Sequence, residues 1–490
     1  MIKNFKWLLL VSLTFVACNN DDDSGIDTNS SDGLPLTAGT AIFSKYVALG
    51  DSFAAGFSDN ALFIAGQQNA YTNILSQQFA LVGGGAFTTP LMADNIGGFS
   101  AGGVQIPSLG TRLYFNGSAP VNVAGVSGTE ITERLTGPFN NLGVPGAKSY
   151  HLGFPGYASL NPYFGRFASS PTATVVGDAV AQAPTFFSLW IGGNDVLGYA
   201  TSGGSGVNQT GNLNPATYGS SDITDPNVFA SSFSGFVTSL VANGAKGVVA
   251  NLPYVNALPY FTTVPYNPVP LDAATASLLN GANGYGVYNG GIQFALSAGL
   301  INAAEATRRT ITFQAGNGNA VVMVDSYLTN LTAYGIPSYR QATSEDFLVL
   351  PSRSFIGTMV GGNPMQINGV SVPLADNWVL SKEEAAEIKV ATDAYNVTIE
   401  SVANANGLAF FDAKTTMNQL ITDGIVSNSF TLTSTYVTGG TFSLDGIHPS
   451  PRGYAFLANK FIEAINAKYG SNMKGVNLGD YQILYPATLQ

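Results

Sequence analysis

The chain has 490 residues, of which 45% are hydrophobic and only 10% are charged, and its net charge is −11. This length and apolar content allow one large elaborated domain or two to three ordinary ones. The negative balance argues against nucleic acid or anionic lipid as a binding partner, because both attract an excess of Lys and Arg.

The N-terminus is typical of a bacterial export signal. Two lysines precede an apolar stretch over residues 7–16, which is too short to span a membrane. Cys18, the sole cysteine, follows the small residue Ala17, and this arrangement resembles the cleavage box of bacterial lipoproteins. We therefore expect residues 1–17 to be a signal peptide and Cys18 to be lipidated. An ordinary signal peptide that contains a cysteine is the alternative.

Residues 18–40 are polar and rich in turn-forming residues, which predicts a flexible tether. Three aspartates over 21–23 resemble the acidic surface-export tag of some lipoproteins, or they are a plain solvated spacer. A lipidated Cys18 places the chain in the bacterial cell envelope, anchored to a membrane, and we expect the outer membrane. With no other cysteine and two histidines, we expect no metal site and no cofactor.

The first half of the folded chain alternates strand and helix patterns. A strand is predicted over 46–49 and a helix over 71–81, followed by a Gly-rich insertion over 83–140. A β-hairpin is predicted within this insertion, with its turn at Asn116-Gly117. A helix over 174–184 leads into an apolar strand within 185–195.

The pattern repeats further along the chain. A helix from 233 ends at Asn243-Gly244 and precedes a strand over 247–250. A second insertion, 255–380, carries a predicted helix near 291–309 and an apolar run over 320–325, without a predictable topology.

The last quarter contains two clear helices around one strand. A capping box of Ser381 and Glu384 begins the first helix, which ends at Asn406-Gly407 before a strand over 408–413. The second begins at Ser450-Pro451 and ends at Gly470, leaving 471–490 as a C-terminal extension. This alternation predicts a parallel sheet with helices on both faces, in which sites lie at the carboxyl ends of the strands.

The two histidines limit the possible nucleophilic chemistry. A serine nucleophile needs a base, and His448 has Asp445 three residues before it in a turn that lets the carboxylate orient the imidazole. His151 has no such partner nearby, and we expect it to be structural or to line the substrate site. The tripeptide Gly-Asp-Ser over 50–52 ends the first strand and offers Ser52 as the nucleophile, although the tripeptide alone is a weak signal.

Four short blocks occur in order along the chain: GDS (50–52), NLGVPGA (141–147), GGND (192–195) and DGIHP (445–449). Together they resemble the SGNH hydrolases, also called the GDSL esterase/lipase family. The resemblance implies a flavodoxin-like three-layer α/β/α fold over 41–470, with a mainly parallel sheet elaborated by the two insertions.

The resemblance also implies roles for individual residues. Ser52 would be the nucleophile, His448 the base and Asp445 the acid that orients it. The oxyanion hole would comprise the backbone N–H groups of Ser52 and Gly146 and the side chain of Asn194, with Gly143 as a rival for Gly146. Asn194 also suits a plain turn residue, Asp195 is expected to brace the loop, and Asp51 to hold the turn at the strand end.

The expected activity is hydrolysis of esters outside the cytoplasm through an acyl-enzyme intermediate. Lipid esters, acetylated glycans and small acyl esters are all compatible with the family. A catalytically silent surface lipoprotein that binds glycan or lipid is one alternative. An anchoring or assembly role of the two insertions is another.

Overall fold

The computed structural model describes residue 30 and residues 33–489. The predicted signal peptide over 1–17, Cys18 and the tether up to residue 29 lie outside the described residues. Lipidation and location in the cell envelope therefore stay predictions. In the part of the chain that the structure describes, no helix is both long and apolar enough to cross a membrane.

A sheet of five parallel strands forms the centre of the molecule. Its strands are β1 (Tyr46–Gly50), β6 (Asn141–Gly143), β7 (Phe186–Trp190), β8 (Lys246–Ala250) and β15 (Ala409–Phe411), arranged in the order β15-β8-β7-β1-β6. Counted along the chain, this is the order 2-1-3-4-5 of flavodoxin-like sheets. The predicted fold class is confirmed.

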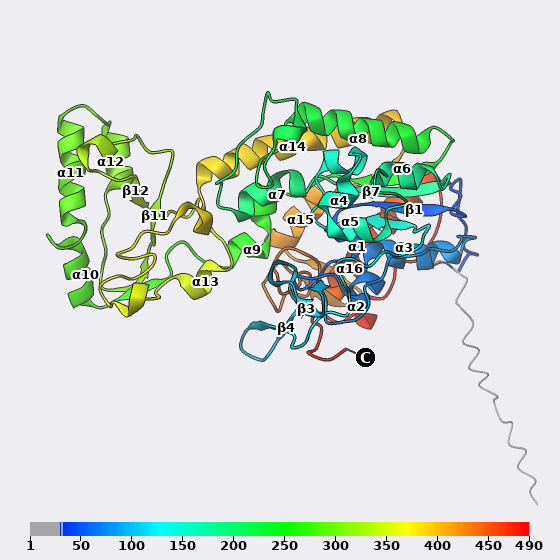
Figure 1. The fold of residues 1–490 in the computed structure, drawn as a ribbon, viewed down its shortest axis with the longest axis horizontal. Coiled ribbons are helices and arrows are strands. Elements are labelled where there is room, and N and C mark those ends of the chain that lie inside the picture. The colour runs from blue at the N-terminus through cyan, green and yellow to red at the C-terminus, as the bar shows by residue number, and fades with distance from the viewer. Residues whose placement is uncertain (1–29, 31–32, 490) are drawn as a thin grey trace, which may run out of the picture.

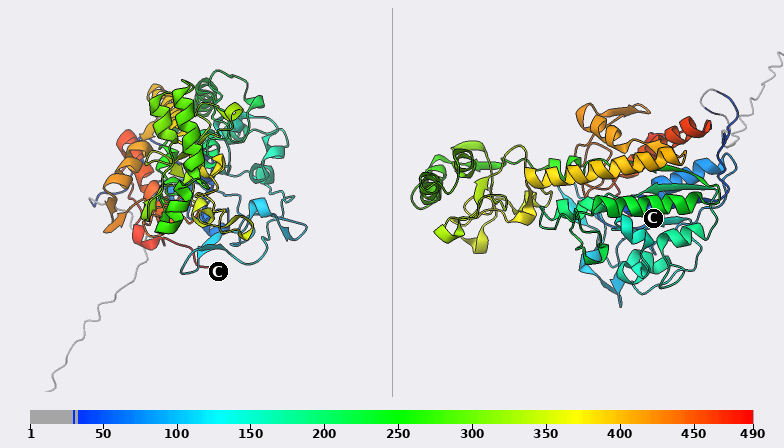
Figure 2. Two further views of the ribbon diagram at one scale, coloured as in Figure 1. Left: turned by 90° about the vertical axis from the view of Figure 1, so that its left-hand side faces the viewer. Right: turned by 90° about the horizontal axis from the view of Figure 1, so that it is seen from above.

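Helices cover both faces of the sheet, which gives three layers (Figures 1 and 2). One face carries α6 (Val175–Val180), α8 (Pro226–Val241) and α14 (Lys382–Ala405), and the other carries α3 (Tyr71–Ala80) and α16 (Pro451–Tyr469). The capping box at the start of α14 is present: the Ser381 hydroxyl accepts the Glu384 N–H, and the Glu384 carboxylate accepts the Ser381 N–H.

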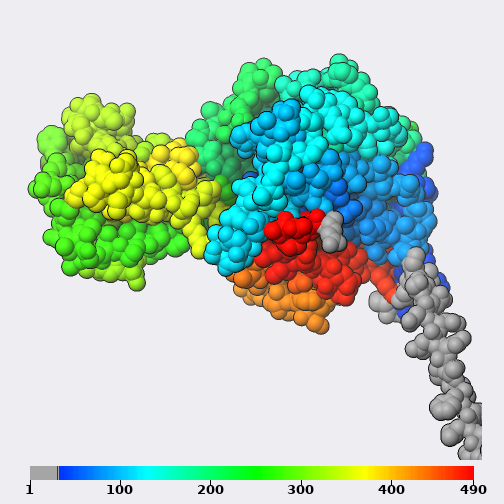
Figure 3. Space-filling view, turned by 60° about the horizontal axis from the view of Figure 1, so that its bottom comes forward, coloured from blue at the N-terminus to red at the C-terminus, as the bar shows by residue number. Residues whose placement is uncertain are grey.

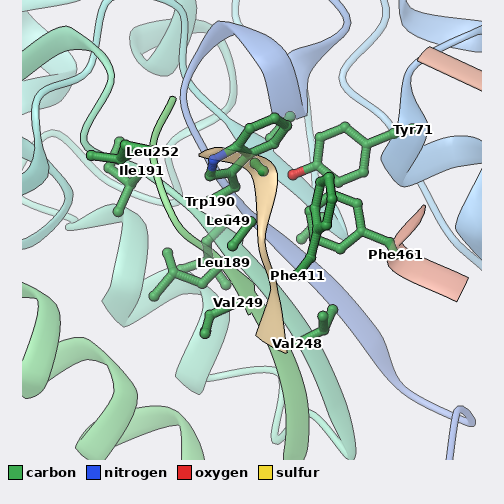
Figure 4. Packing of buried hydrophobic residues seen from close by; sticks show 14 of the residues in the cluster. Leu49, Tyr71, Leu189, Trp190, Ile191, Val248, Val249, Leu252, Phe411 and Phe461 are labelled. Carbon is green, nitrogen blue, oxygen red and sulfur yellow. The ribbon is translucent and has the colours of Figure 1, made fainter. Parts of the chain in front are cut away.

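Apolar side chains leave the strands on both faces, as Figure 4 shows. Trp190 and Phe411 point toward Phe461 of α16, whose ring stacks on Tyr71 of α3. Leu189 and Val249 lie side by side in the sheet and point to the opposite layer. Burial on both faces is the reason that these strands read as continuous apolar runs in the sequence.

The first insertion is built from short elements beside the sheet. It contains β2 (Ser100–Ala101), β3 (Val104–Gln105), β4 (Leu113–Phe115) and β5 (Pro120–Asn122). The predicted hairpin is confirmed, because β4 pairs antiparallel with β5. Gly117 in its turn has a φ of +99°, which favours glycine. The short helices α2 (Ile64–Gln68), α4 (Tyr157–Leu160) and α5 (Pro162–Phe167) flank this region in the chain.

Residues 264–380 of the second insertion, which was predicted over 255–380, form a distal lobe that extends from the body (Figures 1 and 3). Its elements are β9 (Val269–Leu271), α10 (Ala273–Asn280), α11 (Tyr285–Ser297), α12 (Ala303–Arg309), β10 (Gly316–Asn319), β11 (Val322–Val324), β12 (Tyr339–Gln341), β13 (Phe347–Leu348), α13 (Ser352–Phe355) and β14 (Val379–Leu380). The lobe has apolar clusters of its own. The chain reaches the lobe through α9 (Pro259–Thr262) and returns through α14.

The prediction of one helix near 291–309 is wrong. The structure has two helices, α11 and α12, separated by a turn in which Gly299 has a φ of +72°. Asn302 caps the second helix by accepting the Glu305 N–H, so the turn at Gly299 ends one helix and Asn302 begins another.

Both ends of the described chain pack on the body. The tether was predicted to extend to residue 40, but Thr37 N–H donates to the Asn472 side chain and Thr40 N–H donates to the Tyr469 carbonyl. The body contacts therefore begin before residue 41. In the C-terminal extension, Tyr485 is buried against Phe63, so this segment is part of the packed body.

Candidate active site

Ser52 lies at the carboxyl end of β1, where the chain turns into the short helix α1 (Ser52–Ala55). The Asp51 carboxylate caps this helix by accepting the Phe53 N–H at 3.0 Å, so Asp51 holds the turn as predicted. Ser52 is the first residue of the helix, and its own N–H therefore has no intrahelical partner. The apolar run of β1 ends at Gly50 because the next residues turn into α1 and place the Ser52 hydroxyl at the edge of the sheet.

The C-terminal DGIHP block folds back onto this serine. His448 Nε2 lies 2.8 Å from Ser52 Oγ, and His448 Nδ1 lies 2.9 Å from Asp445 Oδ2, although Ser52 and His448 are 396 residues apart in the chain. An ionised carboxylate only accepts hydrogen bonds, so Nδ1 carries the proton. Nε2 is then free to accept the Ser52 hydroxyl proton.

Asp445 is held by four N–H groups. Its Oδ1 accepts the backbone N–H groups of Ile447 and His448, each at 2.8 Å, and its Oδ2 accepts the Asn60 N–H besides His448 Nδ1–H. Burial by itself would raise the pKa of Asp445, but the His448 imidazole and the N–H donors lower it to about 2. Asp445 is therefore ionised over the whole neutral range.

The turn at Asp59-Asn60 supports Asp445, and our sequence reasoning did not identify it. Both residues have positive φ, 49° and 64°, a conformation that Asp and Asn tolerate better than other side chains. Asp59 Oδ1 accepts the Leu444 N–H, and the Asp59 N–H donates to Ser443 Oγ. Burial raises the pKa of Asp59 to about 7, to which the charge of Asp445 contributes. The adjacent Asp and Asn in the sequence were the available signal.

The other two predicted oxyanion residues lie next to each other. Asn194 begins α7 (Asn194–Thr201) just after β7, and its Nδ2 donates to the Ala147 carbonyl at 3.1 Å, directly beside Gly146. An amide nitrogen carries two N–H groups, so one is left for a ligand. Gly192 in the same block has a φ of +124°, and a Cβ there would lie 2.7 Å from the Phe229 ring. Only glycine fits at that position.

The geometry also separates Gly146 from its rival Gly143. The Gly143 N–H is already donated to Asn141 Oδ1 at 3.0 Å, whereas the Gly146 N–H has no backbone or side-chain partner among the described residues. Gly146 has a φ of +79°, and a Cβ there would meet no atom within 4 Å. Among the described residues the Gly146 N–H is thus free to donate to a ligand, as an oxyanion donor must be.

His151 and Asp195 have structural contacts. The His151 ring stacks on Tyr157 and its Nδ1 accepts the Lys148 N–H, while burial lowers its pKa to about 4. Asp195 accepts both the N–H and the hydroxyl of Ser149, so it braces the loop as predicted. Within residues 33–489, no group of three His, Cys, Asp or Glu side chains is placed to hold a metal ion.

No protein-family model matches this chain, and no curated protein matches it. An alpha/beta hydrolase enzyme from the metagenome of Lake Arreo is similar in structure at 11% identity and a TM-score of 0.34, over 87% of this chain and 96% of that chain. An acetylxylan esterase from Geobacillus stearothermophilus matches at 11% identity and 0.32, over 88% and 97%. A phospholipase A1 from Streptomyces albidoflavus matches at 13% and 0.31, over 87% and 100%. The strand order, and not these matches, defines the fold class, and the side-chain geometry alone carries the chemistry.

Proposed function

We propose that the protein is a serine ester hydrolase of the SGNH type. The observation that carries the proposal is the continuous chain of hydrogen bonds from Ser52 Oγ through the His448 ring to Asp445, with distances of 2.8 and 2.9 Å. These distances lie within the range in which a base takes the proton of a nucleophile.

The reaction has two halves. Ser52 Oγ attacks the ester carbonyl carbon while His448 Nε2 takes the hydroxyl proton, and the carbonyl oxygen becomes an oxyanion. The C–O bond to the alcohol then breaks, and His448 gives its proton to the leaving alkoxide, which leaves an acyl-serine. Water attacks this acyl group with His448 as base again, so that a carboxylic acid and free Ser52 result.

Three donors would stabilise the oxyanion. They are the N–H of Ser52 at the start of α1 and the N–H of Gly146, both without a partner among the described residues, and the second N–H of the Asn194 amide. Preformed donors of this kind typically lower the activation barrier by roughly 3–4 kcal/mol each. Asp445 stabilises the imidazolium that forms during attack.

The test is Ser52→Ala, assayed with short p-nitrophenyl esters and with a fluorophosphonate label. We expect wild type to hydrolyse the ester and take the label, and the variant to do neither while keeping its circular dichroism spectrum. Ser188→Ala is the matched control, because Ser188 is a buried serine whose hydroxyl bonds Tyr46 in the sheet. Equal hydrolysis by wild type and Ser52→Ala refutes the assignment. No turnover and no label in wild type favours a silent binding protein.

A further inference from the structure

An apolar cavity lies beside the proposed active site. It is lined mainly by apolar side chains, which include Trp190, Leu197, Leu252, Val255, Leu258 and Ile447. Its volume is about 60 Å³, several times the roughly 10–15 Å³ that one water molecule needs. We name it the acyl cavity.

The residues that line the acyl cavity place it next to Ser52. Asp51 and Phe53, which flank Ser52, both contribute to its lining. Gly193, which precedes Asn194, and Ile447, which precedes His448, do so as well. The nucleophile, the base and a proposed oxyanion donor are thus each one residue away from the cavity wall.

The acyl cavity borders a further cavity that is also lined mainly by apolar side chains. A second cavity, also of about 60 Å³, shares Phe53, Trp190, Pro253 and Leu258 with it. This second cavity continues among Met417, Leu420 and Phe456, which belong to the layer of α15 (Ala413–Thr422) and α16. Asp51 is the charged residue of the acyl cavity: its Oδ1 accepts the Phe53 N–H, and its Oδ2 accepts no hydrogen bond from the described residues.

The chemistry of this lining selects its occupant. A sugar ring would place several hydroxyl groups against a lining that is mainly apolar, which costs free energy for each hydroxyl group left unsatisfied. A saturated hydrocarbon chain loses no hydrogen bonds there, and its transfer out of water is favourable.

We propose that the acyl cavity holds the acyl chain of the substrate, and that the preferred substrates are esters of fatty acids with several methylene groups rather than acetyl esters. This proposal rests on the proposed ester hydrolase function. When the carbonyl carbon lies at Ser52 Oγ, the chain extends past Phe53 and Trp190 into the cavity.

The test is the chain-length profile of the full chain with p-nitrophenyl acetate, butyrate, hexanoate and octanoate. Each buried methylene is expected to raise kcat/KM by roughly threefold to fourfold until the cavity is filled. Leu197 is half-buried on α7 and lines the cavity, so Leu197→Trp is expected to fill it. The kcat/KM of that variant should fall toward the acetate value for long chains.

Two further variants complete the design. Leu296→Trp makes the same change at a half-buried leucine of α11 in the distal lobe and should keep the wild-type profile. Leu258 lies in the wall common to both cavities, so Leu258→Ala should move the optimum to longer chains. Leu258→Ala decides the question if Leu197→Trp does not fold.

The outcomes separate the two proposals. A flat or falling profile in wild type, with turnover that Ser52→Ala abolishes, overturns the acyl cavity and leaves the hydrolase standing. A folded Leu197→Trp variant whose kcat/KM still rises with chain length as in wild type also overturns the acyl cavity. No turnover and no fluorophosphonate label on Ser52 overturn both proposals. A rise with chain length that Leu197→Trp removes and Leu296→Trp retains supports the acyl cavity.

Discussion

The replacement Asp445→Asn tests the orienting role of this carboxylate most directly. In wild type both carboxylate oxygens of Asp445 accept N–H groups, two from the backbone at Oδ1 and two more at Oδ2. An amide has one oxygen, so its nitrogen must face N–H donors on one side or the other. With the amide nitrogen toward His448, Nδ1 has to accept, and the ring proton moves to Nε2, where it blocks transfer from Ser52.

The replacement is expected to affect both kcat and the free energy of unfolding. The wrong tautomer is expected to lower kcat by about 10⁴-fold, the value for the same change in another serine triad. In the folded protein the pKa of Asp445 is about 2, below the ordinary value of 3.8. This difference contributes about 2 kcal/mol to the free energy of unfolding above pH 4. Because the folded pKa is the lower one, this stability is present at neutral pH and is lost as pH falls through about 2.

The assay combines steady-state kinetics with urea unfolding at pH 7. Asp225→Asn is the matched control, since Asp225 is a buried carboxylate that accepts the N–H groups of Gly211, Asn227 and Val228 outside the site. The control should lose stability and keep kcat. A folded Asp445→Asn whose kcat stays within about tenfold of wild type refutes the orienting role.

Two further predictions concern Asn194 and His151. Asn194→Ala should lower kcat by about 10²–10³ with little change in KM, measured by steady-state ester hydrolysis; a loss confined to KM contradicts its oxyanion role. Burial, aided by the charge of Lys148, lowers the pKa of His151 to about 4, below the roughly 6.5 of an unfolded chain. The folded state therefore loses stability as pH falls from about 6.5 toward 4. His151→Phe keeps a ring against Tyr157 and takes up no proton, so its unfolding free energy in urea should vary less over that pH window; an equal slope in both proteins contradicts this reasoning.

Local patterns predicted the elements that position the site. The strand before Gly-Asp-Ser, the hairpin at Asn116-Gly117 and the capping box at Ser381 depend on residues close together in the chain, and all three are present. The strand order could not be derived from such patterns, because each pairing joins segments tens to hundreds of residues apart. The distal lobe was unpredictable for the same reason.

The sequence predicted the catalytic residues better than the residues that hold them in place. His448 and Asp445 were recognisable because they lie three residues apart, whereas Gly146 and Gly143 could be separated only when the structure showed that the Gly143 N–H is already donated to Asn141. The turn at Asp59-Asn60 reaches Asp445 across 385 residues, and no spacing rule reveals such a contact.

The separation of Ser52 from its base has a consequence for biosynthesis. Ser52 is synthesised first, and the ribosome reaches His448 only 396 residues later. A chain that is stalled or truncated before that point carries an inert hydroxyl, whatever else has folded. The order of synthesis thus delays activation of the nucleophile until the segment that carries His448 has been made.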